Sequence, residues 1–175
     1  WLPFCLWALH RYIRLPRTAT LLACAACFAL QAATASYLAY FALVPLVIVA
    51  IAEWLRTRVP VATVIRDAVP AIVLVLAVML PIARGYIEVR AQQGLKRTGG
   101  DIVAMSADVG DYVSAPPALK LWSGIGSGRG EHELFLGAMA MGLALLALVV
   151  RGREYAVVTY AVVLVVAFLL SLGPQ

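Results

Sequence analysis

The chain alternates between long apolar runs and short connections that are polar and mostly basic. Five runs carry almost no charge, and they cover residues 18–34, 37–55, 68–83, 134–150 and 155–172. At a helical rise of about 1.5 Å per residue, each run covers roughly 24–29 Å, close to the ~30 Å hydrocarbon core of a bilayer. The pattern predicts an all-α fold, a polytopic transmembrane helix bundle with about five spans.

The composition supports a membrane protein over a soluble one. Hydrophobic residues make up 63% of the 175 residues and charged residues only 13%, well outside the usual globular range. A soluble domain of this size cannot bury five helices that are apolar on every face. The lipid bilayer is therefore the first expected partner.

The arginines predict the orientation. They gather in three groups that fall on the same side if the five helices alternate: Arg11, Arg14 and Arg17; Arg56, Arg58 and Arg66; Arg151 and Arg153. Short basic loops mark the cytoplasmic side. We expect a multi-pass protein of the inner (plasma) membrane, with the N-terminal end cytoplasmic and the C-terminal end extracytoplasmic. The net charge of +5 then comes from these loops, and no nucleic acid partner is expected.

Four regions follow from this pattern. Residues 1–17 are apolar with a basic end and are too short to span, so we interpret them as an interfacial or re-entrant segment. The alternative is the end of a truncated preceding helix, since the chain starts without methionine and is expected to be an internal fragment. Residues 18–83 hold three transmembrane helices, residues 84–133 an extracytoplasmic loop, and residues 134–175 two transmembrane helices.

The cysteines and the small residues predict packing rather than chemistry. Cys24 and Cys27 form a C-x-x-C pattern inside the first apolar run, without further thiols or histidines nearby in sequence, so we interpret them as packing residues and expect no disulfide with Cys5. The alanines of the same run allow neighbouring helices to approach closely. No ionisable residue is expected near the bilayer centre, which argues against a transport pathway in this chain.

The extracytoplasmic loop is the soluble part that is large enough for a site. Asp101 is a good N-cap for an amphipathic helix to about Val113. On that helix Asp108 and Asp111, three residues apart, would bind a divalent cation or act as acid and base, or would simply form its solvated face, the simpler interpretation. His132 between two glutamates is a weaker metal candidate, and glycine-rich residues 123–130 favour a mobile loop over a phosphate cradle.

Several stretches carry a family resemblance. The W-L-P start, A-L-H-R-Y, F-A-L-Q-A, SADVGDYVSAPP and E-L-F-L-G resemble stretches of large bacterial polytopic proteins of the GT-C glycosyltransferase type. The resemblance implies transfer of a sugar from a polyprenyl-phosphate donor at the extracytoplasmic face, with an acidic catalytic residue in the first extracytoplasmic loop of the complete protein. That residue would lie upstream of this chain, so no catalytic residue is named here.

Within the resemblance, Arg84 and Arg90 at the outer interface are the expected phosphate-binding residues, with interfacial anchoring as the simpler interpretation. A divalent cation would be a further means of stabilising the departing phosphate. Two other functions stay open: a transporter or flippase of lipid-linked sugars, and a noncatalytic membrane scaffold.

Overall fold

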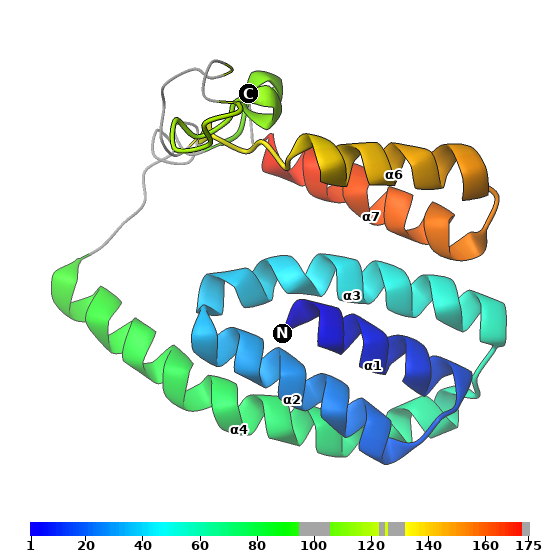
Figure 1. Ribbon diagram of the computed structural model, residues 1–175. Coiled ribbons are helices and arrows are strands. Elements are labelled where there is room, and N and C mark those ends of the chain that lie inside the picture. The colour runs from blue at the N-terminus through cyan, green and yellow to red at the C-terminus, as the bar shows by residue number, and fades with distance from the viewer. Residues whose placement is uncertain (95–105, 123–124, 126–131, 173–175) are drawn as a thin grey trace. The chain divides into compact units, whose positions relative to one another are not determined.

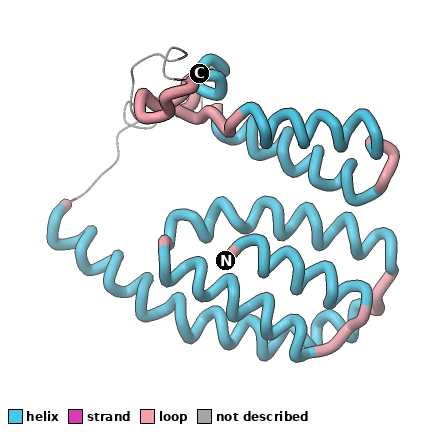
Figure 2. The backbone as a smooth tube through the Cα atoms, viewed as in Figure 1, coloured by secondary structure: helices cyan, strands magenta, loops and turns pink. Residues whose placement is uncertain are grey.

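A computed structural model describes residues 1–94, 106–122, 125 and 132–172. All regular elements in these ranges are helices, which confirms the all-α prediction for the described part of the chain (Figures 1 and 2). The chain divides into two compact units, Trp1–Leu95 and Lys96–Gln175.

The first unit contains four helices. Its central element, α2, has the predicted bounds and contacts each of the other three helices, while α1 also packs along α3 (Figure 1). The segment at the N-terminus is thus a helix packed within the bundle. The bounds are α1 Leu2–Arg14, α2 Thr18–Thr34, α3 Ser36–Thr57 and α4 Val61–Gln93.

Small side chains make the close helix contacts of this unit possible. The buried positions of α2 are Cys24, Ala25, Ala29 and Ala32, and they recur at helical spacing along one side. Small residues allow backbones to approach without a gap, which is the main source of helix attraction in lipid. The alanine-rich sequence of α2 therefore explains its central place.

The cysteines take part in this packing. The Cys5 thiol donates to the carbonyl oxygen of Cys24 (Sγ–O 3.5 Å), and the Cys24 thiol donates to the carbonyl oxygen of Cys5 (3.4 Å). These reciprocal bonds join α1 to α2. All three cysteines, including Cys27, are free thiols.

Helix α4 continues beyond its expected end. Its 33 residues pass through Pro70 and Pro81 and finish at Gly94, whose φ of 62° is the left-handed conformation that glycine adopts easily. Pro81 removes only one backbone donor, and membrane helices tolerate such a loss. Residues 84–93, expected in the loop, are therefore helical.

At one end of the first unit α1 and α3 finish and α2 and α4 begin, and we call it the arginine-bearing end. Two buried carboxylates hold this end together. Asp67 of α4, fully buried, accepts hydrogen bonds from Tyr12 of α1 (3.2 Å), Thr18 of α2 (2.8 Å) and the neighbouring Arg66 (2.9 Å). A buried charge is costly unless donors surround it. Asp67 therefore fixes three helices relative to one another.

Glu53 forms the second carboxylate contact, between α1 and α3. One oxygen lies 3.2 Å from Nδ1 of His10, and the other lies 3.3 Å from the guanidinium of Arg56. The same end of α3 closes with Arg58 in a left-handed conformation, φ 54°, and the Trp54 indole N–H donates to the carbonyl oxygen of Val59 (2.9 Å). This connection brings α4 back beside α2.

The second unit contains a helical hairpin and a short 3-10 helix. The hairpin is α6, Ala138–Arg151, and α7, Tyr155–Ser171, and an Arg151–Glu154 ion pair (3.1 Å) lies at its turn. The 3-10 helix η1 covers Val109–Val113. Of the predicted helix from Asp101 to Val113, residues 101–105 lie outside the described residues and residues 106–108 are not helical. Asp108 is extended and begins η1, where Asp108 and Asp111 cap each other's backbone N–H groups.

The apolar helices differ in length. By length and composition α3 and α4 are able to cross a membrane, whereas α2, α6 and α7 are apolar but shorter. Within the described part of the chain α6 has no buried residue and α7 buries only Thr159. Such exposed apolar surface supports membrane association. The prediction of five spans stays a prediction.

Enlarging a buried alanine of α2 tests the close contacts. Ala32 is fully buried and its neighbour Ala33 is exposed. We expect Ala32→Leu to lower the free energy of unfolding by about 1–3 kcal/mol, because the added methyl groups have no room. Unfolding by SDS in mixed micelles measures this change, and Ala33→Leu is the matched control. Equal stability of both variants would contradict the packing described.

Removing the Tyr12 hydroxyl tests the role of Asp67. We expect Tyr12→Phe to lower the free energy of unfolding by about 1–3 kcal/mol, because a buried carboxylate loses one of its donors. Tyr37→Phe, at a position 65% exposed, is the control and should change little. The same SDS titration compares the two variants, and a smaller loss for Tyr12→Phe than for Tyr37→Phe would remove Asp67 from its proposed structural role.

Candidate functional site

Asp111 and His132 meet in the second unit although 21 residues separate them in the sequence. Nδ1 of His132 lies 2.7 Å from Oδ2 of Asp111. The Asp111 side chain is 6% exposed and that of His132 is 16% exposed. The pair is therefore shielded but reachable from outside at the histidine.

The 3-10 helix η1 holds Asp111 in place. The Asp108 backbone N–H donates to Oδ2 of Asp111 (2.7 Å), and the Asp111 backbone N–H donates to the carbonyl oxygen of Asp108 (3.0 Å). Asp111 is buried and Asp108 is exposed. The interpretation of both as a solvated helix face is thus wrong for Asp111, because its carboxylate points into the capping contact.

The segment that carries His132 is tied to the same turn by the backbone. The Leu134 N–H donates to the carbonyl oxygen of Asp111 (3.0 Å), and the Phe135 N–H donates to that of Ser114 (3.1 Å). The Phe135 ring also packs against Trp122, with ring centroids 5.4 Å apart. These contacts bring His132 to Asp111.

Contacts with α7 place the pair at one end of the helical hairpin. The Tyr112 hydroxyl shares a hydrogen bond with the Ser171 hydroxyl (2.5 Å), and its ring lies 5.0 Å from that of Phe168. The Ala107 N–H donates to the carbonyl oxygen of Ser171 (3.1 Å). The Asp111–His132 pair is thus at the end of α7 opposite to the basic turn between α6 and α7.

The geometry suits acid–base chemistry. An ionised carboxylate only accepts hydrogen bonds, so Nδ1 of His132 donates to Asp111 and the neutral ring has its lone pair on Nε2. A carboxylate that orients an imidazole in this way is the arrangement of a general base and its positioning residue. An imidazole oriented in this way is the kind of group that accepts a proton in general base catalysis.

A cation site has less support from the geometry. The Asp108 and Asp111 carboxylates lie within one turn, but both are used in the mutual cap. Within the described residues, no three His, Cys, Asp or Glu side chains are grouped as metal ligands. The two aspartates therefore belong to the turn that positions His132.

Arg84 and Arg90 both lie on α4, in the first unit, and both are exposed. Arg84 borders a hollow of about 570 Å³ together with Glu88, and all of the residues that line it come from α4. Arg90 does not line this hollow, and six residues of helix rotate it to a different side. The two arginines thus do not form one pocket on α4.

The sequence analysis predicts Asp111 and His132 as separate candidate residues and does not predict their contact. Their pairing depends on the return of the chain from η1 to residue 132, for which the sequence between them shows no periodic pattern. The burial of Glu53 and Asp67 is not predicted from the sequence either. Their signal is an acidic residue that continues a helical row of small buried residues, such as Ala42, Val49 and Glu53 in α3.

Comparison with known proteins adds no relative. No protein family, no curated protein and no solved structure matches the chain.

Proposed function

We propose that the chain is part of a multi-pass protein of the plasma membrane, in which α2, α3, α4, α6 and α7 all span. The support is the distribution of charge, because the basic groups fall at the ends that alternate helices would place on one side. Helices α2 and α7 have 17 residues and α6 has 14, or about 21–26 Å. Local thinning of the bilayer accommodates such short helices at modest cost.

In this arrangement the Asp111–His132 pair lies at the extracytoplasmic side. Arg151 and Arg153 flank the turn of the α6–α7 hairpin, and Ser171, which contacts Tyr112, lies at its other end. The basic turn is expected on the cytoplasmic side. A reaction at the outer face would therefore have His132 within reach.

The reaction we propose is sugar transfer from a polyprenyl-phosphate donor, as the resemblance to GT-C glycosyltransferases implies. In place of the upstream acidic residue that the resemblance implies, we propose His132 as the base: it takes the proton from an acceptor hydroxyl, and the acceptor oxygen forms a bond to the anomeric carbon. The bond from that carbon to the phosphate oxygen breaks, and the polyprenyl phosphate leaves with the electron pair. Asp111 acts as a positioning residue for His132. The observation that carries this proposal is the 2.7 Å contact between them.

Substitution of the pair in the full-length protein tests the proposed base. We expect His132→Ala to lower kcat about 10²–10⁴-fold and to remove the rise of rate with pH that a histidine base produces. Asp111→Asn should lower kcat while keeping His132 in place, and it should alter the same pH profile. Consumption of a lipid-linked sugar by purified protein is the measurement.

Glu133→Gln, next to His132, is the control for this experiment and should leave the rate unchanged. An unaltered rate in His132→Ala would overturn the proposed role of the pair. Movement of the lipid-linked sugar across the vesicle membrane without its consumption would favour a flippase. Absence of both activities would favour a scaffold.

Arg84 is proposed to hold the donor phosphate at the outer end of α4. We expect Arg84→Ala to raise the apparent donor KM about tenfold, the equivalent of one charge-assisted hydrogen bond of about 1.5 kcal/mol. Arg153→Ala, in the basic turn, is the control. An unchanged donor KM would limit Arg84 to anchoring at the interface.

A further inference from the structure

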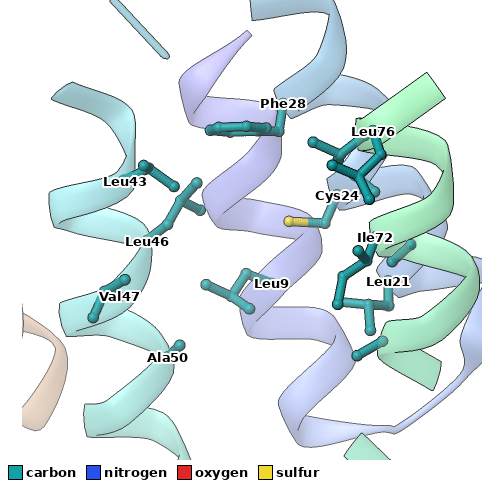
Figure 3. A pocket seen from close by; sticks show the side chains of 14 residues that line it. Leu9, Leu21, Cys24, Phe28, Leu43, Leu46, Val47, Ala50, Ile72 and Leu76 are labelled. Carbon is teal, nitrogen blue, oxygen red and sulfur yellow. The ribbon is translucent and has the colours of Figure 1, made fainter. Parts of the chain in front are cut away.

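An apolar groove runs along the first unit between α3 and α4. It consists of two cavities of about 390 and 460 Å³, which share Leu9, Leu21, Ala50 and Ala68 in their linings and therefore adjoin each other. Figure 3 shows one of them: Leu43, Leu46 and Val47 of α3 face Ile72 and Leu76 of α4 across the groove, and Leu9 lies between them. Each volume is in the range of ~300–1,000 Å³ that is usual for small-molecule sites.

The lining of the groove excludes a polar ligand. Apart from the Cys24 thiol and the ring ends of Tyr12 and Trp54, its side chains are aliphatic or aromatic. Both polar ring ends are already bonded, Tyr12 to Asp67 and Trp54 to Val59. Only an apolar occupant leaves no donor or acceptor unsatisfied there.

The length of the groove fits one leaflet of a bilayer. Along α3 its lining extends from Leu43 to Trp54, which is about 17 Å at the helical rise. Half of the ~30 Å hydrocarbon core is ~15 Å. The groove therefore has the depth of one lipid chain that enters from the arginine-bearing end.

The arginine-bearing end supplies positive charge at the mouth of this groove. Arg14 follows the lining residue Ile13, and Arg58 precedes the lining residue Val59. Both arginines are exposed, and neither forms an ion pair with another described residue. The acidic residues at this end, Glu53 and Asp67, are buried and already have partners of their own, Arg56 and His10 for Glu53 and Arg66 for Asp67. A negatively charged head group would meet the two guanidinium groups where its chain enters the groove.

We propose that the groove between α3 and α4 binds one acyl chain of an anionic glycerophospholipid, whose phosphate is held by Arg14 and Arg58. The apolar lining and the one-leaflet depth select the chain, and the charge at the mouth selects an anionic head group. The proposal rests on the membrane orientation given under Proposed function. It does not rest on sugar transfer, and its site is at the arginine-bearing end.

Lipid retention by the purified full chain tests this proposal. In detergent micelles with either palmitoyl-oleoyl phosphatidylglycerol or palmitoyl-oleoyl phosphatidylcholine, native mass spectrometry counts the bound lipids. We expect one phosphatidylglycerol to be retained, about tenfold more tightly than phosphatidylcholine. Equal retention of the two lipids would overturn the selection by charge.

Two pairs of variants locate the lipid. Ala50→Trp fills the groove and should abolish retention, whereas Ala19→Trp, the same change at an exposed position of α2, should retain the lipid. The double variant Arg14→Gln with Arg58→Gln should reduce the affinity for phosphatidylglycerol to that for phosphatidylcholine. The double variant Arg84→Gln with Arg90→Gln, at the other end of α4, should leave the affinity for phosphatidylglycerol unchanged.

Other occupants give different results. If another helix or a second copy of the chain covers the groove, Ala50→Trp changes the oligomeric state or the stability without loss of a lipid, and the proposal fails. Thermal unfolding of each variant shows whether it is folded. Sugar consumption is measured separately, so failure of the lipid site and failure of the transferase proposal are distinguishable.

Discussion

The arrangement of the first unit depends on the burial of Asp67 among donors from three helices. An isolated carboxylate would lose far more solvation than it regains inside a bundle, so its burial requires Tyr12, Thr18 and Arg66 together. Because these donors come from different helices, the requirement fixes α1 and α2 against the start of α4. The groove between α3 and α4 depends on that placement together with the Glu53–His10 contact, which joins α3 to α1.

The proposed sites in the two units use buried polar groups in different ways. In the first unit the carboxylates of Glu53 and Asp67 are enclosed and join helices, and their arginine partners Arg56 and Arg66 are exposed. In the second unit the carboxylate of Asp111 is enclosed, but its partner His132 is partly exposed. A carboxylate that only joins helices does not need to contact solvent or substrate. A side chain that accepts a proton must be able to contact its substrate. This difference in exposure favours the second unit for the proposed chemistry.

The extent to which the sequence predicted the structure depends on the kind of interaction. Apolar runs act locally, and α2 and α7 agree with their predicted bounds to within one residue. The third apolar run, residues 68–83, was a poorer guide, because α4 begins earlier and continues past Pro81 to Gln93. The amphipathic pattern from Asp101 was misleading, since the mutual cap of Asp108 and Asp111 begins the turn at Val109. The Asp111–His132 contact depends on chain reversal, which no local pattern encodes.

The contrast between α2 and α6 has a consequence for how the two helices can evolve. Every residue of α6 is at least partly open to its surroundings in the described part of the chain, whereas α2 presents alanines to its neighbours. Selection on α6 can then act on overall hydropathy, so that leucine, valine and methionine exchange freely over generations. Selection on α2 must act on side-chain volume at individual positions, so far fewer substitutions in α2 are neutral.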